Sequence, residues 1–232
     1  MSAALEIIVL DADDAIEAAA GGATALEVVR DLEVGGLTPD LKTLAEIRAA
    51  VCLPLNVMVR PHARDFVYSP DESAQILRDA EAVTRCGADG VVFGALTAGG
   101  EVDLPLVRRV KEVSRAVSPA VRLTFHRAIE AVADADAALP MLRGLADRVL
   151  VSGLQAGQGE SRELLGAWVR RYGADIHFAC GGGVTLTNAR QIVLATGVPE
   201  VHLGGAVRTD RRVERAKVAA VASSLQNLRR SP

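Results

Sequence analysis

SPDESAQILRDAEAVTRCGADGVVFGAL, residues 69–96, shows the pattern from which the fold can be predicted. Its first part has the marks of a helix, because Ser69 and Glu72 form a capping-box pair and the stretch ends near Gly87. Its second part, GVVFGAL at 90–96, is a short β-rich run. A capped helix joined directly to a strand is the repeating unit of an α/β fold with parallel strands.

The same alternation extends in both directions along the chain. We expect strands at residues 5–10, 25–30, 55–61, 90–96, 121–129, 148–153, 175–181 and 200–207. Helical patterns are found at residues 13–22, 38–50, 69–87, 103–116, 134–145, 161–172, 187–195 and 211–229, with Thr38 as the expected N-cap of the second. Eight strand–helix units in 232 residues favour a single-domain (βα)8 TIM barrel over an open sheet.

The composition fits a barrel whose parallel strands are buried on both faces. Half of the residues are hydrophobic but only 3% are aromatic, so Val, Leu, Ile and Ala must fill the interior.

Charge and cysteine content limit the partners that the chain can have. The net charge of −3, with interspersed signs, argues against a nucleic-acid partner and for a small-molecule partner. Cys52, Cys86 and Cys180 are far apart, which argues against a disulfide framework or a thiolate zinc site. Without a signal-peptide pattern or an apolar run of roughly 20 residues, we expect a cytoplasmic protein with no membrane partner.

Polar side chains lie inside several of the predicted strands. Because side chains alternate along a strand, parity can be tested at eight of them, and it directs most of these toward the barrel axis: Glu6, Glu27, Asn56, Arg60, Thr124, His126, Ser152 and His202. A carboxylate buried at Glu6 or Glu27 needs a cation or hydrogen-bond donors beside it, and Arg60 and His126 are the expected partners. Arg127 faces outward if its strand is regular.

These strand residues suggest a chemical site, and a structural alternative exists. Glu6, Glu27 and His126 are candidates for acid–base catalysis, because a histidine beside a carboxylate can transfer protons near neutral pH. We expect the other polar strand residues, with Arg127, to bind substrate: Asn56, Thr124, Ser152 and His202. The alternative is a buried ion-pair network that closes the barrel without a catalytic role.

RPHARD, residues 60–65, follows the third predicted strand. The guanidinium groups of Arg60 and Arg64 suit a carboxylate or phosphate, because each can donate two parallel hydrogen bonds. His62 is a further candidate for substrate binding, and Asp65 is a further candidate for catalysis. The competing interpretation is a salt bridge of Arg60 or Arg64 with Asp65 that only orders the loop.

Glycine-rich turns follow the last two predicted strands, with Gly181, Gly182 and Gly183 after the seventh and Gly204 and Gly205 after the eighth. TIM barrels often bind phosphate at these two places through backbone N–H groups, which predicts a small anionic ligand. The alternative is turn geometry that needs glycine for a positive φ. Cys180 is expected to be a small buried residue rather than a nucleophile. The segment 155–160 is a candidate lid or a solvated loop.

Eight motifs follow one another along the chain: LEI, LEVV, GGLTP, VRPHARDFVYS, GADGVVFGAL, LTFHRAIE, RVLVSG and GGGVT. Together, over about residues 5–207, they resemble the CutC family, which is named for copper homeostasis. The resemblance implies a cytoplasmic (βα)8 protein that is often oligomeric, so we expect a homo-oligomer. It also implies copper as a cofactor, through cysteines in the first two strands. The positions that correspond here are Ile8 and Val29, which lack the thiolate that Cu(I) prefers. His62 stands where the family commonly has arginine.

Three classes of function remain open. The first is an enzyme, such as a lyase, isomerase or hydrolase, that acts on a small phosphorylated or sugar-derived anion by Glu/His acid–base chemistry. The second is a copper-binding protein that uses histidines for Cu(II): His62, His126, His177 or His202. The third is a scaffold without catalysis. We favour the enzyme, because strand charges and anion-binding turns are predicted at the same end of the barrel.

Overall fold

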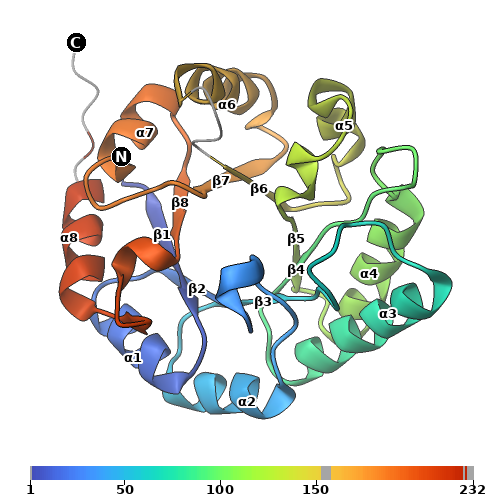
Figure 1. Cartoon of the computed structure of the whole chain (residues 1–232), viewed down its shortest axis with the longest axis horizontal. Helices are drawn as coiled ribbons and strands as arrows, with labels where there is room; N and C mark the ends of the chain where they lie inside the picture. Colours follow the sequence, from blue (N-terminus) through green and yellow to red (C-terminus); the bar gives the residue numbers. More distant parts are fainter. Residues whose placement is uncertain (1, 153–157, 227, 229–232) are drawn as a thin grey trace.

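Eight parallel strands close into a barrel in the computed structural model, which describes residues 2–152, 158–226 and 228. Each strand pairs with the next along the chain, and β8 pairs with β1, so the ring has no free edge (Figure 1). The strands are β1 Ala4–Val9, β2 Ala25–Val28, β3 Leu55–Met58, β4 Gly90–Phe93, β5 Arg122–Phe125, β6 Arg148–Ser152, β7 His177–Gly181 and β8 Glu200–Leu203. The predicted TIM barrel is therefore confirmed.

Helices surround the ring on the outside (Figure 1). They are α1 Ala12–Ala20, α2 Leu41–Ala50, α3 Pro70–Arg85, α4 Leu104–Val117, α5 Ala135–Met141, α6 Gln158–Tyr172, α7 Ala189–Thr196 and α8 Arg215–Leu225. The capping box of α3 is present, with Ser69 Oγ accepting from the Glu72 N–H and the Glu72 carboxylate accepting from the Ser69 N–H. None of the described helices has the length and apolar content that a bilayer crossing needs.

Several predicted strands are too long at their carboxyl ends. Apolar residues beyond those ends are fully buried, among them Val59, Ile129 and Val207, so their sequence resembles strand. The chain instead leaves the sheet and turns over the mouth of the barrel. Short 3₁₀ helices follow three strands, with η1 Leu32–Val34 after β2, η2 Arg127–Glu130 after β5 and η3 Gly205–Val207 after β8.

Two helix starts also differ from expectation. Helix α2 begins at Leu41 with Asp40 in the N-cap position, not at Thr38. Thr38 instead pairs with Arg60, since its Oγ1 accepts from the Arg60 N–H at 2.9 Å and its own N–H donates to the Arg60 carbonyl at 3.0 Å. Helix α8 begins at Arg215 rather than at residue 211, because residues 208–213 form a small hairpin of β9 Arg208–Thr209 and β10 Arg212–Val213.

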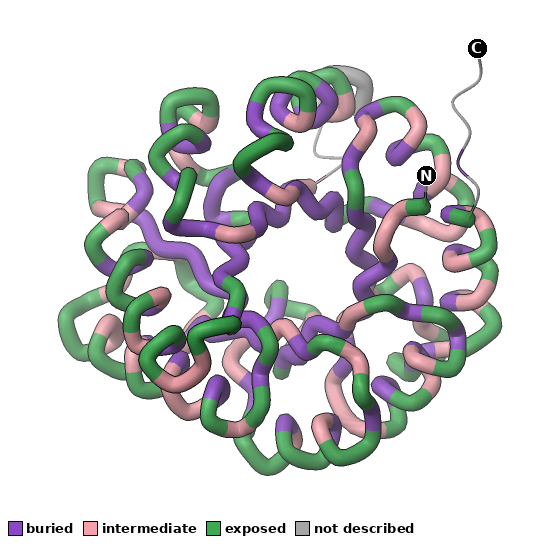
Figure 2. The backbone as a smooth tube through the Cα atoms, turned by 180° about the vertical axis from the view of Figure 1, so that it is seen from behind, coloured by how far each residue is buried: buried purple, intermediate pink, exposed green. Residues whose placement is uncertain are grey.

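The main core lies between the strands and the outer helices, and the strands are buried along the ring (Figure 2). A second, smaller apolar cluster is formed by Val29, Met58 and Val92, with Ile8 and Leu10 packed against it. The strand residues of the first cluster alternate with those of the second, as Ile7 and Ile8 do, so the smaller cluster lies on the inner side of the ring. Two groups of polar side chains also lie inside the barrel, and His202 contacts a carboxylate of each.

Candidate functional site

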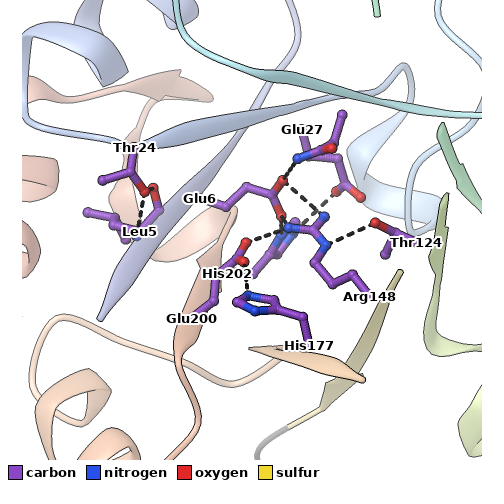
Figure 3. Close-up of polar contacts among 10 residues, drawn as sticks. Leu5, Glu6, Thr24, Glu27, Thr124, Arg148, His177, Glu200 and His202 are labelled. Carbon is purple, nitrogen blue, oxygen red and sulfur yellow. Dashed lines mark hydrogen bonds and ion pairs between the residues drawn. The ribbon is translucent and has the colours of Figure 1, made fainter. Parts of the chain in front are cut away.

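The first polar group, here called the inner network, is centred on Glu6 of β1, which is fully buried (Figure 3). Its carboxylate accepts hydrogen bonds from Asn56 Nδ2 at 2.6 Å, Arg148 Nη2 at 3.1 Å and His202 Nδ1 at 2.6 Å. Arg148 also bonds Glu200 and donates from Nε to Thr124 Oγ1 at 2.9 Å. Glu200 in turn lies 2.7 Å from His177 Nε2. Every charge at the centre of this network thus has an opposite charge beside it.

Electrostatics stabilises the ionised forms in this network. Burial alone would raise the pKa of Glu6, but Arg148 and His202 hold that pKa far below its ordinary value. Burial alone would lower the pKa of His202, but the Glu27 and Glu6 carboxylates raise it to about 10. His202 is therefore an imidazolium at neutral pH, with one ring nitrogen facing each carboxylate.

The expected partners of the buried carboxylates were wrong. Glu6 pairs with Arg148 and His202 instead of Arg60 and His126. Arg148 begins β6 in register with Thr124, and its long side chain reaches across the barrel interior to β1. Arg60 follows the end of β3 and lies at the carboxyl-terminal end of the barrel instead. The signal in the sequence was Arg148 itself, a single cation at the start of the otherwise apolar run RVLV.

The second polar group lines a cavity of about 780 Å³ at the carboxyl ends of the strands. Two of its polar side chains belong to strands, Glu27 to β2 and His202 to β8. Three more follow directly after strands: Arg60 after β3, and His126 and Arg127 after β5. Apolar side chains complete the wall: Ile8, Met58, Leu150, Phe66, and Leu32 and Val34 of η1. Sequence reasoning missed this wall, because η1 carries no strong helix pattern and its place over the mouth depends on the tertiary fold.

Glu27 and His126 each present a polar atom without a partner among the described residues. Glu27 Oε2 lies 3.2 Å from His202 Nε2, while its Oε1 has no hydrogen-bond partner. His126 Nδ1 accepts the Ala128 N–H at 3.1 Å, and its Nε2 is buried without a partner. Burial, helped by the positive charge of Arg60, lowers the pKa of His126 to about 3. The ring is therefore neutral at pH 7, with its proton on Nε2.

The glycine turns line the same cavity. Gly182 and Gly183 have φ values of 58° and 77°, a conformation that glycine adopts readily. In the described part of the chain, no acceptor bonds the N–H groups of Gly182, Gly183, Val184 or Gly204. Arg127 lies beside Gly182, because a Cβ added there would be 3.7 Å from its guanidinium carbon. We call these four N–H groups with Arg127 the anion cradle.

Arg127 does not face outward as expected from a regular strand. It begins η2, lines the cavity and donates to Glu130 at 3.1 Å. The strand ends at Phe125, so the alternation of side chains stops two residues before Arg127.

Three predicted binding residues lie outside the cavity lining. Ser152 is one of them, and its N–H donates to Glu130. Asn56 and Thr124 also lie away from the cavity lining, within the inner network.

Of the candidate residues in the RPHARD segment, only the first, Arg60, lines the cavity. Its guanidinium lies 5.0 Å from the ring centre of Phe66. The salt bridges to Asp65 that the alternative interpretation needs are not formed among the described residues. Arg64 pairs with Glu72, and Asp65 accepts the Val67 N–H at 3.1 Å.

His62, also in this segment, packs on Tyr68 with ring centres 5.2 Å apart. Neither His62, Arg64 nor Asp65 contributes to the cavity lining. Burial raises the pKa of the Cys180 thiol to about 12, so it stays protonated at neutral pH. The candidate lid at 155–160 lies largely outside the described residues.

The copper site implied by the family resemblance does not fit these residues. Val29 packs with Met58 and Val92 in the inner apolar cluster, and Ile8 lies against them, so Met58 supplies the one sulfur of that cluster. Across the described ranges, no three His, Cys, Asp or Glu side chains are arranged to hold a metal ion. His62 and His126 have different neighbours, and His202 is enclosed by carboxylates.

Solved structures of other proteins resemble this barrel. The chain is 25% identical to the solved CutC protein of Streptococcus agalactiae, whose description names copper homeostasis, with a TM-score of 0.79 over 89% of this chain and 100% of that one. Phosphoribosyl anthranilate isomerase from Thermococcus kodakaraensis, at 19% identity, has a TM-score of 0.65 over 97% of this chain and 99% of that one. The second likeness shows the barrel fold alone.

Sequence relatives and a family model narrow the assignment. The chain is 39% identical to a CutC family protein of Xanthomonas campestris pv. campestris strain B100, over 85% of this chain and 81% of that protein. It is 34% identical to a CutC family protein of Aliivibrio fischeri strain MJ11, over 88% of this chain and 83% of that protein. The model of the CutC family matches residues 3–207, and the chain therefore belongs to the CutC family.

Proposed function

We propose that this protein is an enzyme that acts on a small anionic substrate, phosphorylated or sugar-derived, by the acid–base chemistry of its cavity. One observation carries the proposal. A single cavity holds an anion cradle and also the unpartnered polar atoms of Glu27 and His126. A scaffold has no use for a buried carboxylate oxygen and a buried imidazole N–H that lack partners, because each costs stability.

The cradle suits a phosphate or carboxylate group. The backbone N–H groups of the two turns have no acceptor among the described residues, and the Arg127 guanidinium, which is paired with Glu130 at the same cavity, adds a charged donor. Arg60 adds a second cation that is 92% buried, and two backbone carbonyls, those of Val34 and Gly36, hold its Nη1 at 3.3 and 3.5 Å. The cradle would hold the charged end of a substrate, while Glu27, His126 and Arg60 act on the remainder.

A thermal-shift screen tests this proposal directly. Inorganic phosphate, phosphorylated sugars and sugar acids would be added to the full chain, and the melting temperature would be followed. A ligand at a hundred times its Kd should raise the melting temperature by roughly 5–10 °C for a chain of this length.

The screen has a matched pair of variants. Arg127→Gln removes the guanidinium of the cradle. The same rise in melting temperature should then need about ten times more ligand. Arg115→Gln, at a surface pair with Asp147, should leave the response unchanged. If no anion raises the melting temperature, or if both variants respond like the natural chain, the proposal is wrong.

A further inference from the structure

The tautomer of His126 restricts what this residue can do in the cavity. Its Nδ1 is occupied by the Ala128 N–H, so a substrate can meet only the Nε2 side. The backbone just after β4 packs closely against the ring, because a Cβ on Gly94 would lie 2.5 Å from Nδ1. Phe66 packs on the same ring, with centres 5.0 Å apart. His126 is thus held as a neutral hydrogen-bond donor, and it has no free lone pair with which to accept a proton.

Glu27 is held for the opposite task. His202 bonds its Oε2, and His202 is bonded in turn by Glu6, whose carboxylate accepts from three donors of the inner network. The remaining oxygen, Oε1, is buried without a partner in the described structure. A carboxylate with one oxygen anchored and one open can take a proton without changing its position.

We infer that this cavity removes a proton from the carbon beside a carbonyl group of a small phosphorylated aldehyde or ketone, with Glu27 as base and His126 Nε2–H as donor to the carbonyl oxygen. This inference rests on the proposed function and names its substrate class. Arg60, which lies close to His126 and Phe66, is the second donor for that oxygen.

The step balances without a further reactant. Glu27 Oε1 takes the proton, the C–H electron pair becomes a carbon–carbon double bond, and the carbonyl π pair moves to oxygen. The resulting enolate oxygen receives the hydrogen bonds of His126 and Arg60. A neutral imidazole is well suited to this role, since it donates to the oxygen without giving up its proton completely. Return of a solvent-derived proton from Glu27 to carbon restores the substrate.

Deuterium exchange measures this step even when the final product is unknown. The full chain would be incubated in D2O with dihydroxyacetone phosphate and other small phosphorylated aldehydes and ketones, and loss of the C–H signal would be followed by NMR. We expect exchange with at least one probe, reduced at least 100-fold by Glu27→Gln and more than 10-fold by Glu27→Asp, which keeps the charge. Exchange that persists in Glu27→Gln overturns the inference.

The state of His126 can be read without any substrate. Nitrogen NMR of the ring should show a neutral imidazole protonated on Nε2 from pH 5 to 8, and a doubly protonated ring at pH 6 overturns the inference. His126→Gln, which keeps an N–H donor, should retain more exchange than His126→Ala. If anions raise the melting temperature but no probe exchanges, the inference is wrong while the proposed function stands. If no anion binds, the proposed function itself fails.

Discussion

The inner network and the cavity are two sets of buried charges in one barrel, and they differ in how completely their members are paired. In the network, the Glu6 carboxylate has three donors, and Arg148 lies between two acids. In the cavity, Glu27 and His126 each leave one atom without a partner in the described structure. Buried charge alone therefore does not identify a site. Incomplete pairing at the wall of a cavity is the better guide, because a ligand that enters the cavity can bond the unpaired atoms and offset their cost.

The largest effect should come from breaking the network at Arg148. Arg148→Met leaves Glu6 and Glu200 without their guanidinium, and should lower the free energy of unfolding by about 3–5 kcal/mol. Urea unfolding at pH 7 measures this loss. Arg115→Met, at a partly exposed pair, is the matched control and should cost less than about 1 kcal/mol. Equal losses in the two variants would remove the distinction between network and surface pairs.

The pH dependence of stability should show the same network. The pKa of His202 is about 10 in the folded state against an ordinary 6.5. Its contribution is therefore complete below about pH 6.5 and is lost as the pH rises toward 10. The pKa of Glu6 is lowered, so its contribution is lost instead as the pH falls below its ordinary 4.5.

Unfolding free energies measured from pH 7 to 9 should decline in the natural chain and stay flatter in His202→Asn. Tyr68 and Cys180, whose pKa values burial raises to about 12, add to the decline only near pH 9 and above, and they do so in both chains. Parallel pH profiles for the two chains would contradict the assignment of a charged His202.

Gly90, which begins β4, and Gly94, which follows this strand, allow the two regions to be tested with the same substitution. A Cβ at Gly90 would be 2.1 Å from Asn56 Oδ1, so Gly90→Ala should displace a donor of Glu6 and cost about 1–3 kcal/mol. A Cβ at Gly94 would be 2.5 Å from His126 Nδ1, so Gly94→Ala should disturb the cavity. We expect Gly90→Ala to lower stability more, and Gly94→Ala to lose more of the ligand-induced thermal shift. The reverse order would show that the two levels are not independent.

The smallest effect is expected at Gly205. A Cβ there meets nothing within 4 Å, and its φ is not positive, so Gly205→Ala should change the free energy of unfolding by less than about 0.5 kcal/mol. Because Gly205 lines the cavity, the added methyl should weaken phosphate binding a few-fold, measured by calorimetric titration. A large loss of stability would mean that the turn after β8 is structural.

The fold could be predicted from sequence because it depends on local signals that repeat. The capped helix at Ser69 and the alternating apolar runs are visible in one stretch, and eight units define a closed ring. The ends of strands were less certain, since Ile129 and Val207 are as buried in 3₁₀ turns as they would be in strands. Those apolar residues indicate burial, but they do not indicate strand geometry.

The site was predicted only in part, because pairing across a barrel is not a local property. Glu27, His126, Arg60 and the glycine turns were found and do line one cavity. Arg148 was overlooked as the partner of Glu6, because the two residues are 142 apart in the sequence and only the closed ring brings them together. Parity along a strand shows which face a residue occupies, but it does not show at which depth its side chain ends.

Closure of the ring between β1 and β8 has a consequence for how the chain is made. Glu6 and its partner His202 are 196 residues apart, and Arg208 donates to the Ile8 carbonyl across 200 residues. The ribosome therefore makes Glu6 long before it makes Arg148 and His202, the two cations that neutralise it. Until synthesis is nearly finished, the first strand cannot bury Glu6 at low cost, and the nascent chain must wait for its last units. Such long-range closure is slow and leaves the unfinished chain exposed to aggregation.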